Sequence, residues 1–95
     1  MQEKVLDNLK IAIVLRSIRG ILGMSQAEFA QWLDVPRSTI TRAESLRLPL
    51  KVNTLFKIIR MVEEKGVVLD MLADEPTFKL TTRFIENEYQ QLGQL

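Results

Sequence analysis

The segment from residue 23 to residue 45, GMSQAEFAQWLDVPRSTITRAES, constrains the fold of this chain more than any other. It contains two short helical patterns separated by a break at LDVP. Three apolar residues recur at helical spacing in the first pattern and form one stripe: Phe29, Ala30 and Leu33. Ser25 precedes this pattern, with Glu28 three residues later, which predicts a helix that starts with a capping box.

The second pattern has two faces of different chemistry. Ile40 and Ala43 point one way, and small inward residues allow two helices to cross closely. Four polar residues point the other way: Arg37, Ser38, Thr41 and Arg42. An outward face rich in hydrogen-bond donors is what a helix needs in order to read bases in the major groove of DNA.

The same segment resembles the helix-turn-helix of the phage repressor and Cro (XRE-like) family, whose pattern is close to G-x-S-Q-x-x-L-A-x-x-x-G-V-x-R-S-T-I-S-R-x-E. The matching positions are Gly23, Ser25, Gln26, Ala30, Val35, Arg37, Ser38, Thr39, Ile40, Arg42 and Glu44. The chain departs from the pattern at Asp34, where the family has a left-handed glycine, and aspartate tolerates that conformation better than most residues. Pro36 replaces the usual serine, which suits a first helical turn but removes the capping hydroxyl.

If the second helix enters the major groove, its N-terminal outward residues reach the base edges first. The candidates for reading bases are therefore Arg37, Ser38, Thr41 and Arg42. Arginine can form a bidentate pair with guanine, with a phosphate contact as the alternative, and the threonine methyl can pack on a thymine methyl. The resemblance implies that Gln26 contacts a DNA phosphate, although an amide there can also brace a neighbouring base-reading side chain. Further phosphate candidates lie near helix N-termini and in the following loop: Thr39, Arg47, Lys51 and Asn53.

Arg19 and Glu44 match positions that, in this family, often form a partly buried ion pair between the first helix and the recognition helix. We therefore assign this pair a structural role. Breaking a buried ion pair by removing one partner is strongly destabilising, because a charge is left unpaired.

The distribution of charge supports a localised surface for phosphates. Residues 1–35 carry four basic and four acidic groups, residues 36–60 six and one, and residues 61–95 three and seven. The net charges are therefore 0, +5 and −4, which sum to the +1 of the whole chain. A basic middle segment indicates contact with nucleic acid, and an ordinary solvated surface with uneven charge is the alternative.

Composition excludes several other classes of function. The chain has no Cys and no His, which rules out disulfides and thiolate metal sites and removes the commonest general base. There is no glycine-rich phosphate loop and no convergent acidic cluster, so we expect no enzyme activity, no catalytic residues, no metal and no cofactor. The longest apolar run, residues 11–15, is far too short to cross a membrane, and the polar N-terminus is no signal peptide. These features favour a cytoplasmic location.

The rest of the chain predicts a mainly α protein, a repressor-like bundle of four helices followed by a short β-hairpin or strand and a C-terminal helix. Besides the two motif helices, helical patterns cover residues 3–22 and 51–65, with a loop at 46–50. Strand patterns at 67–71 and 77–81 flank a turn at 73–76, and a last helix covers 82–92. We expect residues 1–66 to form the DNA-binding domain, with its motif at 25–45, and residues 67–95 to extend it for dimerisation.

These features together predict a sequence-specific DNA-binding transcriptional regulator, acting as a homodimeric repressor on an inverted-repeat operator in double-stranded DNA. The expected dimer interface comprises Val67, Leu69, Ile85, Tyr89 and Leu92. One alternative is an antitoxin or a restriction–modification controller that represses its own operon, with an operon-encoded toxin as a further partner. Another is a protein-interaction module that uses this fold without DNA.

Overall fold

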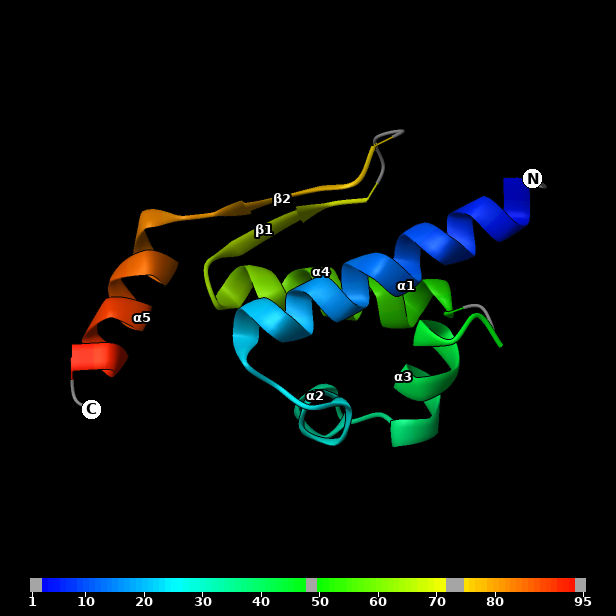
Figure 1. The fold of residues 1–95 in the computed structure, drawn as a ribbon, viewed down its shortest axis with the longest axis horizontal. Coiled ribbons are helices and arrows are strands. Elements are labelled where there is room, and N and C mark those ends of the chain that lie inside the picture. The colour runs from blue at the N-terminus through cyan, green and yellow to red at the C-terminus, as the bar shows by residue number, and fades with distance from the viewer. Residues whose placement is uncertain (1–2, 48–49, 72–74, 94–95) are drawn as a thin grey trace. The chain divides into compact units, whose positions relative to one another are not determined.

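The computed structural model describes residues 3–47, 50–71 and 75–93, with side chains from residue 8 onward. The described part is mainly helical, with five helices and one two-stranded antiparallel sheet, which confirms the predicted fold class. The chain divides into two compact units, Met1–Leu55 and Phe56–Leu95 (Figure 1). No helix of the described residues is long and apolar enough to cross a membrane.

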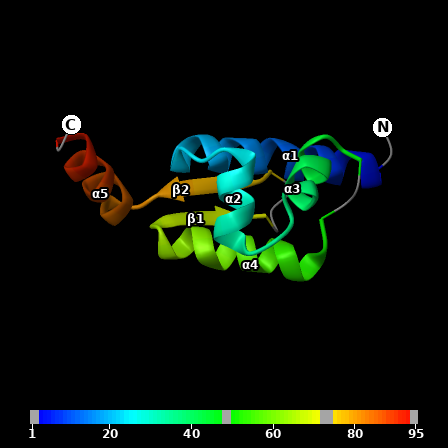
Figure 2. The ribbon, with the colours of Figure 1, turned by 90° about the horizontal axis from the view of Figure 1, so that it is seen from below.

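The first unit holds the predicted helix-turn-helix. Helix α1 spans Glu3–Leu22, the range expected from the sequence, and ends where Gly23 adopts a φ of +68°. Helices α2 (Gln26–Leu33) and α3 (Arg37–Glu44) follow. Helix α3 packs against both α1 and α2, and Figure 2 shows α2 and α3 beside each other. The buried apolar residues of these helices are Ala12, Val14, Leu15, Ile18, Phe29, Ala30, Leu33, Ile40 and Ala43.

The turn between α2 and α3 forms without a glycine. Asp34 takes the left-handed conformation, with φ 57° and ψ 49°, as expected at this position. Its N–H donates to the carbonyl of Gln31 over 3.1 Å, and the N–H of Val35 donates to that of Ala30 over 3.0 Å. Pro36 is the N-cap of α3 and gives it no side-chain cap, also as expected. The first-turn N–H groups of α3 are therefore left without a capping side chain.

The capping box predicted at the start of α2 is present. The N–H of Glu28 donates to Ser25 Oγ over 3.1 Å, and the N–H of Ser25 donates to Glu28 Oε1 over 3.0 Å. The bonds from Ser25 lower the pKa of the Glu28 carboxyl, because they favour its charged form.

This lowered pKa predicts an acid-sensitive contribution to stability. The contribution of Glu28 is complete above the carboxyl's unfolded pKa of 4.5 and is lost as the pH falls through its lower folded value. Glutamine at this position keeps an acceptor for Ser25 but does not titrate. The melting temperatures of the wild type and Glu28→Gln should therefore differ at neutral pH and converge as the pH falls below 4.5. A difference in melting temperature that stays constant with pH would contradict this assignment.

The second unit is built around a sharp turn and a hairpin. Helix α4 spans Val52–Glu64, one residue shorter at each end than the predicted helix at 51–65, and its residues 52–55 belong to the first unit. Gly66, with a φ of +95°, follows it and leads into β1 (Val67–Asp70). Strand β1 pairs antiparallel with β2 (Thr77–Leu80), with Val67 opposite Leu80, which confirms the predicted hairpin. Of the predicted turn at 73–76, residues 73 and 74 lie outside the described residues, as do residues 48 and 49 of the predicted loop at 46–50.

Helix α5 spans Thr82–Gly93 and is held at its first turn. The Thr81 hydroxyl donates to the carbonyl of Gly66, and the N–H of Phe84 donates to Thr81 Oγ1 over 3.4 Å. Arg83 donates to the carbonyls of Glu63 and Glu64, the last residues of α4, over 2.9 and 3.2 Å. Phe84 is the buried residue of α5, and the four residues of β2 are exposed.

Candidate nucleic-acid interface

Helix α3 separates its residues into a buried side and an open side. Ile40, Ala43 and Glu44 are buried, whereas Arg37, Ser38 and Arg42 are exposed and Thr41 is half-buried. Residues 37 and 41 lie about one helical turn apart, as do residues 38 and 42, so all four share one face of α3. This face presents two guanidinium groups and two hydroxyl groups, the chemistry that base edges and phosphates require.

Arg19 on α1 and Glu44 on α3 form an ion pair. Arg19 Nε donates to Glu44 Oε2 and Arg19 Nη2 to Glu44 Oε1, both over 2.7 Å, so the pairing is bidentate. The side chain of Glu44 is only 3% exposed and that of Arg19 is 19% exposed. The hydrogen bond to Glu44 raises the pKa of the Arg19 guanidinium, which keeps it charged.

Gln26, the first residue of α2, joins this pair to the open face of α3. Its Nε2 donates to Glu44 Oε1 over 3.3 Å, and the Thr41 hydroxyl donates to Gln26 Oε1 over 3.1 Å. The structure therefore places Gln26 in contact with a proposed base-reading residue, which is the bracing arrangement that sequence reasoning allowed for an amide here.

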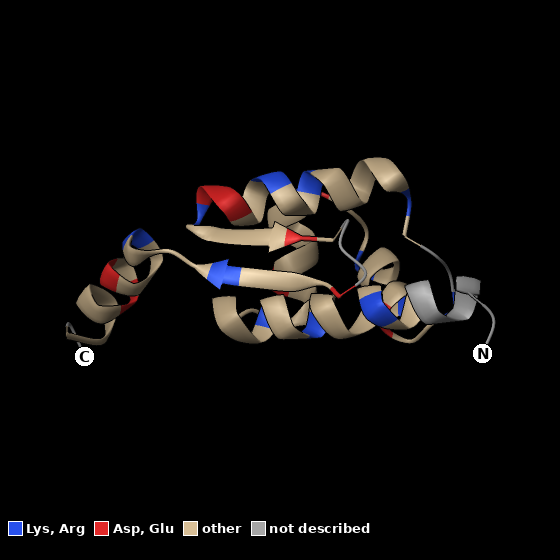
Figure 3. Cartoon of the chain, turned by 90° about the horizontal axis from the view of Figure 1, so that it is seen from above, with Lys and Arg blue, Asp and Glu red and all other residues tan. Residues whose placement is uncertain are grey.

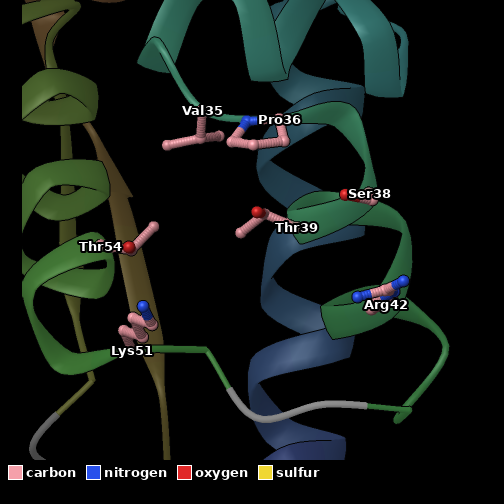
Figure 4. Close-up of a pocket in the computed structure, with 7 residues that line it drawn as sticks. All are labelled: Val35, Pro36, Ser38, Thr39, Arg42, Lys51 and Thr54. Atoms are coloured by element: carbon pink, nitrogen blue, oxygen red, sulfur yellow. The ribbon is translucent and has the colours of Figure 1, made fainter.

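A pocket of about 340 Å³ opens beside α3 within the first unit. Figure 4 shows Thr39 of α3 and Thr54 of α4 pointing toward one another across it, with Lys51 nearby. Its remaining lining residues are Val35, Pro36, Ser38 and Arg42. No acidic residue stands in the first turn of α3 or of α4, both of which are fully described. Three hydroxyls, two basic groups and two helix N-termini make this pocket suited to a phosphate group.

The other phosphate candidates lie on exposed positions. Arg47 follows the end of α3, where its N–H donates to the carbonyl of Arg42 over 2.9 Å. Asn53 is exposed in the first turn of α4. Along α4 the basic residues come before the acidic ones, Lys57 and Arg60 before Glu63 and Glu64, as the colours of Figure 3 show.

The residues proposed for a dimer interface divide into two groups. Val67 and Leu69 are 0% and 5% exposed, so these two side chains are already covered within the chain. Ile85, Tyr89 and Leu92 are 54%, 77% and 65% exposed and follow one another at helical spacing on α5. Only the second group presents an open apolar stripe.

Two contributors to this region were missed by sequence reasoning. Arg16 Nη2 donates to the carbonyl of Glu44 at the end of α3 over 2.6 Å. Arg16 lies three positions before Arg19 and therefore on the same side of α1, which is the sequence feature that could have predicted this contact. Thr54, in the first turn of α4, lines the pocket together with Lys51, which directly precedes that helix. In the described part of the chain, no group of three or more His, Cys, Asp or Glu residues is placed to hold a metal ion.

Residues 5–63 match the model of the antitoxin Xre-like helix-turn-helix domain, and the match covers the motif and nearly all of α1 and α4. The chain therefore belongs to this family of Xre-like helix-turn-helix proteins, which are DNA-binding regulators and antitoxins. No curated protein and no solved structure matches the chain significantly.

Proposed function

We propose that this protein is a sequence-specific transcriptional regulator that represses by occupying an inverted-repeat operator as a homodimer. The observation that carries the proposal is the open face of α3, where Arg37, Ser38 and Arg42 are exposed on a helix anchored from behind by the Arg19–Glu44 pair. The family match, which covers this helix, supports the same function.

In this proposal α3 lies in the major groove and reads bases with Arg37, Ser38, Thr41 and Arg42. The pocket lined by Thr39, Lys51 and Thr54 holds a phosphate of the adjacent backbone. Gln26, Arg47 and Asn53 are further phosphate contacts. Phosphate contacts fix the position of the protein on the duplex, and base contacts select the sequence.

We assign DNA binding to residues 1–66 and dimerisation to residues 67–95. The exposed apolar stripe of α5, Ile85, Tyr89 and Leu92, supports an interface in the second segment. A single copy of the motif reads about one half-site, so a dimer is needed for two recognition helices to lie about 34 Å apart on one face of the duplex.

Selection from a random duplex pool tests this function directly. We expect the full chain to enrich an inverted repeat, which would support DNA reading and a symmetric dimer together. Failure to enrich any sequence would overturn the proposal.

Arg37→Ala and Arg42→Ala should each weaken binding to the selected duplex by about 10- to 100-fold and relax the preference at one base pair, because each removes a bidentate pair worth about 1–3 kcal/mol. Fluorescence anisotropy at several salt concentrations measures both effects. Lys79→Ala on β2 is the control, since it removes the same charge from an exposed position outside the motif. Equal losses for all three variants would indicate a general charge effect and contradict base reading.

A second candidate function is that of an antitoxin that represses its own operon. The matching family, the antitoxin Xre-like helix-turn-helix domain, favours it. In that case the exposed apolar and acidic surface of α5, which carries Glu86 and Glu88, would bind a toxin. Co-purification of the untagged chain with the product of a neighbouring gene distinguishes this candidate from a free-standing repressor.

A further inference from the structure

A chain of hydrogen bonds leads from α1 to the open face of α3. Arg19 donates twice to Glu44, Gln26 donates to Glu44, and Thr41 donates to Gln26. All four residues belong to the first unit. Glu44 is buried, whereas Thr41 is half-exposed on the face proposed to meet DNA.

The carboxylate of Glu44 determines which group donates and which group accepts in each of these hydrogen bonds. A carboxylate paired with a guanidinium accepts hydrogen bonds and has none to donate. The amide of Gln26 must therefore turn its NH₂ group toward Glu44. Its carbonyl oxygen is then the atom that faces Thr41, and because a carbonyl only accepts, the Thr41 hydroxyl must donate its proton to it.

This arrangement limits what Thr41 offers to a base. A threonine hydroxyl has one proton, and here that proton is already engaged. The bond also holds Oγ1 toward α2, which sets the χ1 angle and therefore the place of the methyl group before DNA arrives. The methyl group and the lone pairs of the oxygen are what remain for recognition.

We propose that Thr41 determines specificity through its methyl group and as a hydrogen-bond acceptor. Gln26 is the positioning residue, because it accepts the Thr41 hydroxyl proton and so withholds that proton from the bases. The inference rests on the proposed DNA-binding function. Guanine shows only acceptors, N7 and O6, at its major-groove edge, so Thr41 disfavours it. Thymine shows a methyl group, and Thr41 favours it by apolar contact.

Single-atom changes in the protein and in the DNA test the role of the methyl group. The probe is the duplex selected by the wild type, with each thymine replaced in turn by uracil, which lacks only the methyl. At one position the replacement should weaken wild-type binding about fourfold, the effect of one buried methyl group. Thr41→Val, which keeps a methyl, should show the same loss, and Thr41→Ser should show none. A uracil penalty that persists at every position in Thr41→Ser would overturn the proposal.

A double variant tests the role of Gln26. Gln26→Met removes the acceptor, frees the hydroxyl proton and should remove the exclusion of guanine at the base pair that Thr41 reads. The double variant Gln26→Met/Thr41→Val has no proton to release and should restore the exclusion, which loss of fold or general affinity would not do. If both variants change the preference alike, Gln26 does not act through the hydroxyl and the proposal fails.

The proposed DNA-binding function and the proposed role of Thr41 are tested separately by these experiments. If the wild type enriches no sequence from the random pool, the proposed function falls and this inference with it. If it enriches a motif that the Thr41 variants leave unchanged, DNA reading stands and only the inference is overturned.

Discussion

Arg19→Met is expected to lower the free energy of unfolding by about 3–5 kcal/mol, because it leaves a buried carboxylate without its counter-charge. Glu44 is 3% exposed and loses both 2.7 Å bonds in this variant. Among the described residues, only Gln26 would still reach its carboxylate, through the weaker 3.3 Å bond. Urea unfolding followed by the fluorescence of Trp32 measures the loss in the first unit, since the chain has a single tryptophan and it packs on Phe29 in α2.

Arg16→Met is the matched control for this experiment. It makes the same substitution three residues away on the same helix, but Arg16 is exposed and donates to a backbone carbonyl. We expect it to cost about 1 kcal/mol or less. Equal losses in the two variants would show that the bidentate pair contributes nothing beyond an ordinary hydrogen bond.

Gly66→Ala is expected to destabilise the second unit by about 2–4 kcal/mol, for two independent reasons. Gly66 has a φ of +95°, which side chains rarely adopt. An added Cβ would also lie 2.8 Å from Thr81 Oγ1 and 3.0 Å from the backbone nitrogen of Phe84. The backbone nitrogen cannot move aside as a flexible side chain can, so the start of α5 must shift. Amide hydrogen exchange of β1 and of the first turn of α5 should show the lost protection.

Gly20→Ala controls for the substitution itself. Gly20 lies in α1, and no atom comes within 4 Å of an added Cβ there. Alanine favours the helical conformation over glycine, so this variant should be more stable than the wild type by about 0.5–1 kcal/mol. Unchanged protection in Gly66→Ala would mean that the junction of α4, β1 and α5 adapts, contrary to the expectation.

Features that depend on nearby residues were predictable from the sequence. The capping box of Ser25 and Glu28, the left-handed turn at Asp34 and the helix ends at Gly23 and Gly66 all form as expected. Each of these depends on backbone conformation and bonding within a few positions, which local residue types decide.

Features that join distant parts of the chain were harder to predict. The link from Gln26 to Thr41 and Glu44 spans 15 and 18 positions, and it forms only because α2 and α3 cross closely. Resemblance to a family predicted the ion pair between Arg19 and Glu44, whereas composition and periodicity alone did not predict it.

The face of β1 was also ambiguous in the sequence. Three of its four residues are apolar, Val67, Val68 and Leu69, so no alternation of polar and apolar residues indicated which side is covered. In the structure Val67 and Leu69 are buried and Val68 is 41% exposed.

The buried side of α5 was also not predicted. The sequence shows a helical stripe of Ile85, Tyr89 and Leu92, but the residue that α5 buries is Phe84, which lies beside that stripe.

The bond between Thr41 and Gln26 has a consequence for how such a protein diverges. A regulator acquires a new operator by exchanging the residues that read bases, and each exchange must leave the fold intact. The side chains of Arg37, Ser38 and Arg42 are exposed, so mutation can alter them at little cost to stability. Thr41 shares its hydroxyl with Gln26 and, through it, with Glu44. Three positions of the proposed recognition face can therefore change independently, whereas Thr41 is expected to change only together with its partner Gln26 on α2.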